Sequence, residues 1–289
     1  RRFPFGMAIT QLALPHTKRR GGLQGSGGKA WVAALLLLRG LPSSLPGRWP
    51  CAPATVLPPS CRPDRPRDDC SADGSGSRSI IQVVARRLAD RGWAHVPSCG
   101  VSPGLRSAAR RELACMPASW WMHGATPSGD RQYREDVIFT LRTQQAGGRT
   151  SMPGLLQLSR DIEAFAMLAA RDSHGRARGL CLTGRFEPMV ARYDPGARYL
   201  PHVDTDGTDG RILTAIYYLN PHWEAQSGGA LRLHGAAGKH VDILPKEDSL
   251  VLFRADQVLH EVRPASRERF ALSIWFLGSE RSDTPAHGL

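Results

Sequence analysis

The chain has 289 residues, a length that allows one large domain or two small ones. Its net charge of +12 is unevenly spread, because residues 1–78 hold 12 Lys and Arg against 4 Asp and Glu, whereas residues 79–289 hold 26 against 22. This near balance in the larger part argues against nucleic-acid binding, which needs a basic patch on a folded face. The six cysteines form no C-x-x-C pair, so we expect no zinc ribbon and a reducing compartment, cytoplasmic or nuclear.

The N-terminal segment has the composition of a leader. Its apolar run Ala30–Leu38 is far below the roughly 20 residues of a membrane span, so we expect no membrane association. No acid precedes this run, as in a signal peptide or an Arg-rich transit peptide. Residues 41–77, rich in Pro, Gly, Ser and Arg, cannot offset the entropy of ordering. We therefore expect residues 1–78 to be a disordered basic leader. Residues 1–50 would either target the chain to an organelle or the secretory pathway, or be an extension of the gene model.

Residues 79–289 are predicted to form one domain that begins with helices. Ile80, Ile81, Val84 and Leu88 have helical spacing, and Gly92 ends the pattern. Further helices are expected at 103–116 and 152–171, and strands at 93–98 and 136–141. The pair Trp120–Trp121 is expected to serve packing, the usual role of large aromatic side chains.

After Gly184 the sequence changes to short apolar runs separated by turn residues. Eight such runs are predicted as strands: 186–193, 198–204, 212–219, 230–235, 240–244, 249–253, 258–262 and 270–276. Their connections, such as "DGTDG" and "PKED", are too short to hold the crossover helix of a parallel sheet. The prediction is a mainly β fold with flanking helices, a double-stranded β-helix (jelly roll) with eight core strands within residues 184–278.

The acidic stretch "RYLPHVDTDGTDGR" at residues 198–211 raises the question of a metal site. A calcium loop that began at Asp204 would need glycine at its sixth position and glutamate at its twelfth. The sequence has Asp209 and Ala215 there, which excludes a calcium loop of this kind.

An iron site fits the same stretch better. His202 and Asp204 are two residues apart, so on a strand both side chains point to the same face. A mononuclear iron(II) site needs one more histidine and leaves positions open for cosubstrate and oxygen. His260 lies in another predicted strand that antiparallel closure can bring beside His202. Arg269, nine residues later, is a candidate anchor for a carboxylate cosubstrate, since its guanidinium can bind both oxygens.

Residues 187–277 resemble the catalytic domain of the 2-oxoglutarate- and iron(II)-dependent prolyl hydroxylases of the hypoxia-inducible-factor type. The matching segments, in order, are "MVARY", "HVD", "IYYLN", "SGGALRL", "HEVRPA" and "RFALSIWF". Weaker similarity reaches back through "YREDVIF" to about residue 80.

This resemblance implies a role for each matched residue. The iron ligands would be His202, Asp204 and His260. Arg269 would pair with the distal carboxylate of 2-oxoglutarate, and Tyr218 would add a hydrogen bond to it. The rest of the cosubstrate pocket would be lined by Tyr193, Thr214, Leu231 and Val262. The substrate proline would be framed by Tyr199, Arg211 and Trp275.

The resemblance also implies a reaction. We expect hydroxylation of a prolyl residue at C4 in a protein substrate, coupled to decarboxylation of 2-oxoglutarate to succinate and CO2, as in oxygen sensing. The cofactors implied are Fe(II), 2-oxoglutarate, O2 and L-ascorbate. The expected partner is a protein that contains the target proline. The chain is expected to be a monomer and not to bind nucleic acid.

Two other functions share parts of this pattern. Alkylation-repair demethylases acting on nucleic acid have the same metal ligands, but as a family they carry two arginines in an asparagine-containing run, and "HEVRPASRERFALSIWF" has no asparagine. A non-catalytic jelly-roll binding module, such as a sugar-binding cupin, would use the polar cluster for recognition alone. Succinate formation from 2-oxoglutarate distinguishes an enzyme from such a module.

Overall fold

The computed structural model describes residues 75–124, 133–142, 152–172 and 179–280. The predicted leader lies outside these residues except at its end, because the first described helix begins at Ser75, four residues before the predicted start. None of the described helices is long and apolar enough to span a membrane. The helices of the described residues are α2 (Ser75–Arg91), α3 (Pro103–Ala114) and α4 (Pro153–Asp172), with short 3-10 turns at Ala118–Trp120, Ala225–Ser227 and Ala236–Gly238.

Each helix forms where local signals and one apolar face coincide. In α2, Val84 and Leu88 are buried at the predicted spacing. α3 begins with Pro103 behind the N-cap residue Ser102, whose hydroxyl accepts a hydrogen bond from the Leu105 N–H at 3.2 Å. α4 buries an apolar face that includes Leu155. The apolar faces of the helices must be buried, and they pack against the larger of two β-sheets.

The strands form two sheets, and strands that follow one another in the sequence often lie in different sheets. Their bounds are β1 (Trp93–Val96), β2 (Met122–His123), β3 (Val137–Thr140), β4 (Leu180–Arg185), β5 (Met189–Tyr193), β6 (Tyr199–His202), β7 (Arg211–Tyr218), β8 (Leu231–His234), β9 (His240–Ile243), β10 (Leu250–Arg254), β11 (His260–Val262) and β12 (Arg269–Glu280). The larger sheet has the order β1-β10-β7-β12-β5-β3-β2, with β4 also paired to β12, and the smaller has the order β6-β11-β8-β9.

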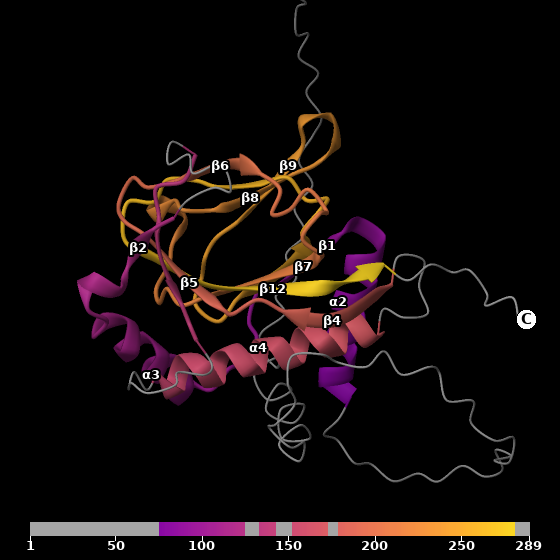
Figure 1. Ribbon diagram of the computed structural model, residues 1–289, viewed down its shortest axis with the longest axis horizontal. Coiled ribbons are helices and arrows are strands. Elements are labelled where there is room, and N and C mark those ends of the chain that lie inside the picture. Colours follow the sequence, from indigo (N-terminus) through magenta and orange to yellow (C-terminus); the bar gives the residue numbers. More distant parts are fainter. Residues whose placement is uncertain (1–74, 125–132, 143–151, 173–178, 281–289) are drawn as a thin grey trace, which may run out of the picture.

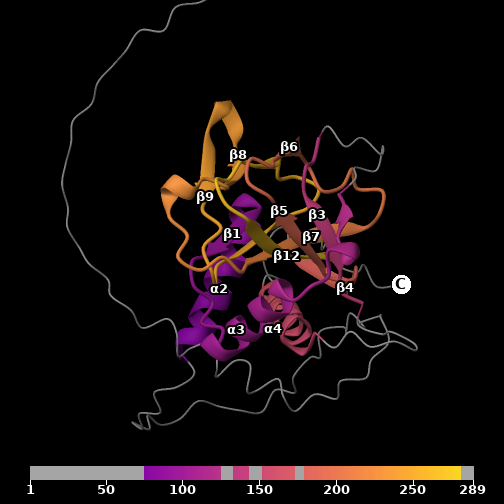
Figure 2. The same ribbon diagram turned by 90° about the vertical axis from the view of Figure 1, so that its left-hand side faces the viewer.

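The eight predicted runs correspond to β5–β12, and their pairing confirms the jelly roll. β5, β7, β10 and β12 lie in the larger sheet, whereas β6, β8, β9 and β11 form the smaller one, and every pair is antiparallel. Figures 1 and 2 show the three helices on one side of the larger sheet and the smaller sheet on the other. The space between the two sheets is where a site can form.

Alternation along β7 divides its side chains between two environments. Leu213, Ala215 and Tyr217 belong to the core shared with the helices. Thr214 and Ile216 point instead into the cavity between the sheets. This period of two is the reason that a single strand can both anchor the helices and supply site residues.

Two strands escaped the sequence prediction, β2 and β4. β4 pairs with the end of β12 across Gly278, where a Cβ atom would clash with the carbonyl oxygen of Cys181. β2 has two residues, both exposed, so it carries no alternating pattern. The tryptophan pair serves packing as predicted, because Trp120 stacks on Phe139 with ring centroids 5.8 Å apart and Trp121 lies 6.3 Å from Phe270.

Candidate metal centre and active site

Strand pairing in the smaller sheet places the two predicted histidine ligands side by side. His202 at the end of β6 is the register partner of His260 at the start of β11, and their ring centroids are 4.2 Å apart. Asp204 follows β6, where its N–H donates to the carbonyl of Ala255 at 3.0 Å. His202 and His260, 58 positions apart in the sequence, thus meet because two short antiparallel strands pair.

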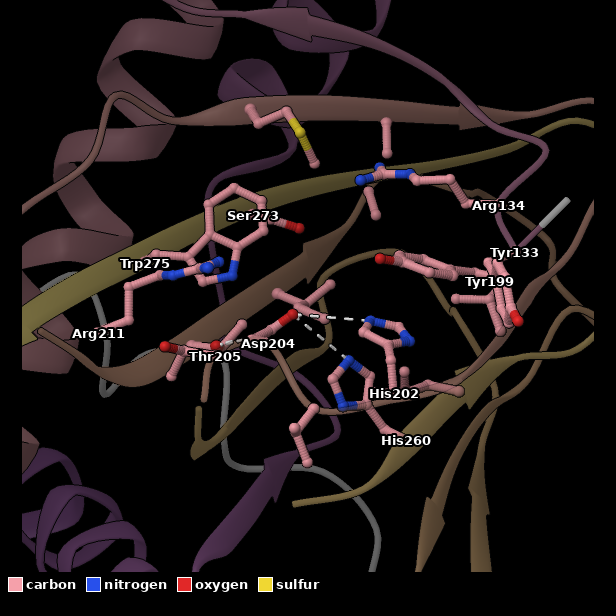
Figure 3. A pocket seen from close by; sticks show the side chains of 18 of the residues that line it. Tyr133, Arg134, Tyr199, His202, Asp204, Thr205, Arg211, His260, Ser273 and Trp275 are labelled. Atoms are coloured by element: carbon pink, nitrogen blue, oxygen red, sulfur yellow. Dashed lines mark hydrogen bonds and ion pairs between the residues drawn. The ribbon is translucent and has the colours of Figure 1, made fainter. Parts of the chain in front are cut away.

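The ligand atoms of this triad are close enough for one cation. The Asp204 Oδ1 lies 3.7 Å from the Nε2 of His202 and 3.8 Å from the Nε2 of His260, and one ligand atom from each of the three residues lies within 4.8 Å of the other two. Both distances to the carboxylate are shorter than two metal–ligand bonds of about 2.1 Å. Figure 3 shows both imidazoles pointing toward the carboxylate.

Each histidine presents the correct nitrogen. The Nδ1 of His202 lies 2.8 Å from the carbonyl oxygen of Leu200, and the Nδ1 of His260 lies 2.9 Å from that of Val258. Because a carbonyl only accepts, Nδ1 must carry the proton and Nε2 keeps its lone pair for a metal. Two imidazoles and a carboxylate are the ligand set typical of non-haem iron(II).

Electrostatics favours the protonation state that a divalent cation requires. Burial lowers the pKa of His260 to about 4, so the imidazole is neutral near pH 7. Burial alone would raise the pKa of Asp204, but His260, His202 and the Thr214 hydroxyl together hold it well below its usual range. The triad therefore offers a neutral imidazole at His260 and an anionic carboxylate at Asp204.

The triad opens into a cavity of about 770 Å³ between the two sheets. Arg269 of β12 lines this cavity, although only 1% of the residue is exposed. Its Nε donates to the carbonyl of Gly229 at 2.9 Å, and its terminal nitrogen donates to the hydroxyl of Tyr218 at 3.4 Å. The guanidinium carbon also lies 4.9 Å from the centre of the Tyr193 ring and 5.0 Å from that of Tyr218.

The charge of Arg269 is not balanced within the described part of the chain, where no carboxylate forms an ion pair with it. A buried cation is costly without an anion beside it. Burial raises the pKa of Tyr218 against the opposing effect of Arg269, so its phenol keeps its proton and can donate it. The pair is therefore suited to a carboxylate, and the metal triad shares its cavity.

Comparison with known proteins agrees with this geometry. Residues 188–277 match the family model of the 2OG-Fe(II) oxygenase superfamily. We call these residues, which are similar to that superfamily, the oxygenase domain.

Named relatives place the domain near one branch of that superfamily. Egl nine homolog 1 of Homo sapiens is 37% identical over 155 residues, which are 52% of this chain and 34% of the relative. The hypoxia-inducible factor prolyl hydroxylase of Caenorhabditis elegans is 44% identical over 110 residues, 36% of this chain and 15% of the relative. The chain therefore spans about a third or less of the length of these relatives.

Solved structures with a similar fold include two prolyl hydroxylases. A prolyl hydroxylase in complex with a hypoxia inducible factor peptide fragment, from Trichoplax adhaerens, superposes with a TM-score of 0.61 at 27% identity, covering 69% of this chain and 90% of that one. A prolyl-4-hydroxylase of Pseudomonas putida superposes with a TM-score of 0.56 at 28% identity, covering 69% and 99%. The jelly roll of the oxygenase domain is thus shared with enzymes whose substrate residue is proline.

All of the predicted cosubstrate residues either contact Arg269 or line the cavity that Arg269 lines. Tyr193 and Tyr218 flank its guanidinium, as described above. The other three line the same cavity from three strands, namely Thr214 of β7, Leu231 of β8 and Val262 of β11. The oxygenase domain thus gathers the predicted set in one place, and each residue comes from the inner face of its strand.

The predicted substrate residues line the cavity (Figure 3) and are partly exposed, and we call this part of the cavity its mouth. The ring of Tyr199 stacks on the imidazole of His202, with centroids 3.6 Å apart. Arg211 donates to Asp209 at 2.6 Å through Nε and lies 5.9 Å from the ring of Trp275. The buried indole nitrogen of Trp275 has no hydrogen-bond partner among the described residues. This mouth combines aromatic faces with polar groups that an incoming peptide can meet.

Sequence reasoning missed the segment before β3, which forms one wall of the mouth. Arg134 makes two hydrogen bonds to buried Asp136, at 2.7 and 2.6 Å, and lies 4.7 Å from the ring of Tyr199. The Leu200 N–H donates to the carbonyl of Tyr133 at 2.8 Å. The only signal was the weak similarity of "YREDVIF", because these contacts cross more than 60 residues of sequence.

Gly229 was also missed. It has a φ of +68°, and a Cβ atom there would lie 2.9 Å from the Cβ of Ala265 and 3.0 Å from a ring carbon of Trp223. Glycine adopts this left-handed conformation without strain. It lets the carbonyl of this residue reach Arg269, so a backbone position serves the cosubstrate site.

Proposed function

We propose that this chain is a 2-oxoglutarate- and Fe(II)-dependent dioxygenase that hydroxylates a prolyl residue, at C4, in a protein substrate. The observation that carries the proposal is the His202–Asp204–His260 triad in one cavity with a buried guanidinium that has no described counter-ion. The similarity to prolyl hydroxylases supports proline as the target residue. An oxygen-sensing role is supported by the names of the relatives alone.

The protein groups would divide the work between them. His202, Asp204 and His260 would hold the iron, and their shared cavity would admit the cosubstrates. When bound, the iron supplies the dioxygen chemistry that couples decarboxylation of 2-oxoglutarate, to succinate and CO2, with insertion of one oxygen atom into a C–H bond. L-ascorbate would serve as the reductant that keeps the metal ferrous.

Arg269 and Tyr218 would bind the distal carboxylate of 2-oxoglutarate. The guanidinium supplies the charge, and the Tyr218 phenol, which accepts from Arg269 at 3.4 Å, has its own proton left to donate. Burial of both groups strengthens these bonds, because water competes weakly inside the cavity. The opposite end of the cosubstrate would then face the metal triad.

The mouth would hold the proline. Tyr199 and Trp275 offer ring faces, and Arg211 offers a cation fixed by Asp209. A pyrrolidine ring packed on aromatic faces exposes its C–H bonds in a fixed direction, which is how positioning lowers the barrier. The substrate is proposed to be a protein, and the chain is proposed to act as a monomer in the cytoplasm or nucleus.

The test is a coupled assay of both products. A proteome treated with the purified protein, Fe(II), 2-oxoglutarate and ascorbate should release succinate and gain about 16 mass units on specific prolyl residues, one oxygen atom each. The matched control is Asp204→Ala, which removes the carboxylate ligand. Succinate without modified proline would contradict prolyl hydroxylation. The absence of both products would contradict the dioxygenase assignment.

A further inference from the structure

Thr214 makes the shortest contact to the metal triad. This residue lies on β7, is 1% exposed, and donates its hydroxyl proton to the Oδ2 of Asp204 at 2.5 Å. The other carboxylate oxygen, Oδ1, is the atom that faces the Nε2 of both histidines. The two oxygens of Asp204 therefore have different partners.

From this division we infer that Thr214 is a positioning residue that holds Asp204 as a one-oxygen metal ligand. The inference rests on the proposed function. A carboxylate can bind a cation through one oxygen or both, and the hydroxyl occupies the oxygen that would make the second bond. One-oxygen binding keeps three positions of an octahedral iron free, the number that a chelating 2-oxo acid and dioxygen need.

The surroundings of Thr214 make it a rigid donor. β7 lies inside the larger sheet, where Thr214 pairs with Phe253 of β10 and with Trp275 of β12. A β-branched side chain on a doubly paired strand has little freedom about χ1. Hydrogen bonds of this kind to ligating groups commonly change metal affinity by about 10- to 100-fold.

The experiment measures metal binding rather than turnover. Co(II) is titrated into the metal-free protein without 2-oxoglutarate, and the dissociation constant is obtained by calorimetry. Thr214→Val, which keeps the shape but removes the donor, should weaken Co(II) binding about 10- to 100-fold. Thr214→Ser, which keeps the hydroxyl, should restore most of the affinity. Leu213→Val on the same strand, in the core shared with the helices, should leave Co(II) binding unchanged.

The outcomes separate this inference from the proposed function. If the wild-type protein binds no Co(II), the metal centre itself is wrong. If the wild type binds Co(II) and Thr214→Val binds it equally well, only the role of Thr214 is wrong. Thermal unfolding of the metal-free proteins shows whether each variant is folded, and a Thr214→Ser variant as weak as Thr214→Val would also contradict the inference.

A second, separate feature is a basic groove of about 410 Å³ that shares no lining residue with the metal cavity. Arg87 and Arg91 of α2 form one wall, and Lys246, between β9 and β10, lies on another. No carboxylate of the described residues forms an ion pair with these three cations. Asp242 also lines the groove, but it is already bound by Arg232 through bonds of 2.7 and 2.8 Å.

The floor of the basic groove is apolar and aromatic, with Trp93 and Ile243 among its lining residues. The guanidinium of Arg91 lies 3.7 Å from the Trp93 ring centre. His95 also lines the groove, and its buried Nε2 has no partner among the described residues. Burial is the main cause that lowers the pKa of His95, and the positive charges of Arg87 and Arg91 lower it further.

We propose that the basic groove binds an acidic segment of a protein partner, namely the protein substrate of the proposed function. Cations on two walls with an apolar floor fit a peptide that carries both acidic and apolar side chains. The nearly balanced charge of residues 79–289 disfavours nucleic acid as the occupant. Binding at a second site would add to the affinity of the mouth for the same chain.

Fluorescence anisotropy with a labelled oligoglutamate peptide tests this site without iron, at roughly 50 mM salt, where exposed charges are weakly screened. Arg87→Glu/Arg91→Glu should weaken binding about tenfold or more. The control Arg86→Glu/Arg160→Glu makes the same change of net charge at arginines that lie outside the groove, and it should bind nearly as the wild type. If both double variants lost affinity for the peptide equally, the effect would be due to net charge alone, and the proposed site would be wrong.

A labelled single-stranded oligonucleotide is the rival probe. If it binds more tightly than oligoglutamate, and through Arg87 and Arg91, the proposed occupant is wrong. Both double variants should bind Co(II) like the wild type, because the groove and the triad share no residue. A failure of the groove therefore leaves the proposed function untouched.

Discussion

Arg269 is a buried cation without a described counter-ion, so its surroundings are suited to bind an anion. It is buried, it lies between two tyrosine rings, and its described hydrogen bonds go to a carbonyl and a phenol. We predict that Arg269→Ala raises the KM for 2-oxoglutarate about 10- to 100-fold, the loss of one or two charge-assisted hydrogen bonds, while Co(II) binding is retained. Succinate formation measured against 2-oxoglutarate concentration gives the KM.

Arg267→Ala is the control for this prediction. Arg267 is two residues away and is exposed beside Trp223, outside the cavity, so its removal should leave the KM unchanged. An Arg269→Ala enzyme with a normal KM would show that the cosubstrate carboxylate binds elsewhere.

Residue-level prediction from sequence succeeded where local spacing carries the information. The alternation of a strand puts His202 and Asp204 on one face, and His260 lies in a run with the same pattern. It failed where a role depends on a long-range contact: nothing in the sequence near Arg134 shows that it lies over Tyr199. The roles of Tyr199, Arg211 and Trp275 toward a substrate stay predictions.

At the scale of elements, Asp248 fixes the chain before α3 to the larger sheet. Its carboxylate accepts from the hydroxyls of Tyr217 and Ser98, at 3.0 and 2.8 Å, and from the N–H groups of Gly100 and Val101, at 2.8 and 3.1 Å. We predict that Asp248→Ala lowers the free energy of unfolding by about 3 kcal/mol or more, because several buried donors lose their acceptor. Urea denaturation measures the change.

Asp90→Ala is the comparison for that variant, since the Asp90 side chain is 66% exposed and pairs only with exposed Arg86 among the described residues. Its effect should stay within about 0.5 kcal/mol. Equal stabilities for the two variants would mean that the Asp248 bonds do not hold the segment.

The turn before β8 provides a second prediction for an element. Gly229→Ala places a methyl group against Trp223 and Ala265 at a φ of +68°. We expect a loss of about 1–3 kcal/mol in the free energy of unfolding and a raised KM for 2-oxoglutarate, since the carbonyl that orients Arg269 must move. Gly207→Ala, also at positive φ but in open space, separates backbone strain from the clash. The KM should rise only in Gly229→Ala.

The elements themselves were largely predictable. Runs bounded by Gly, Asp and Pro turns became β5–β12, and apolar spacing located α2, α3 and α4 to within a few residues. The strands that were missed, β2 and β4, have no alternating burial pattern of their own and are defined by their partners. β4, for example, is a strand because β12 extends beyond the barrel and Gly278 permits close approach.

At the scale of the whole molecule, the jelly roll encloses one site by pairing strands that are far apart in the sequence. Its two sheets bring together a triad from β6, the following loop and β11, and an arginine from β12. The helices stabilise the far face of the larger sheet and leave the cavity open on the other. The sequence pattern predicted this closure, but the width of the cavity and its basic neighbour groove depend on side-chain packing that no local pattern encodes.

The most direct test of the central claim is metal binding together with product formation in one pair of proteins. Wild type and Asp204→Ala are each titrated with Co(II) and then assayed, after exchange to Fe(II), for succinate and for oxygen added to proline. The wild type should bind Co(II) and form both products, whereas Asp204→Ala should bind at least about tenfold more weakly and form neither. Equal metal binding, or equal succinate formation, in the two proteins would contradict the assignment of the triad.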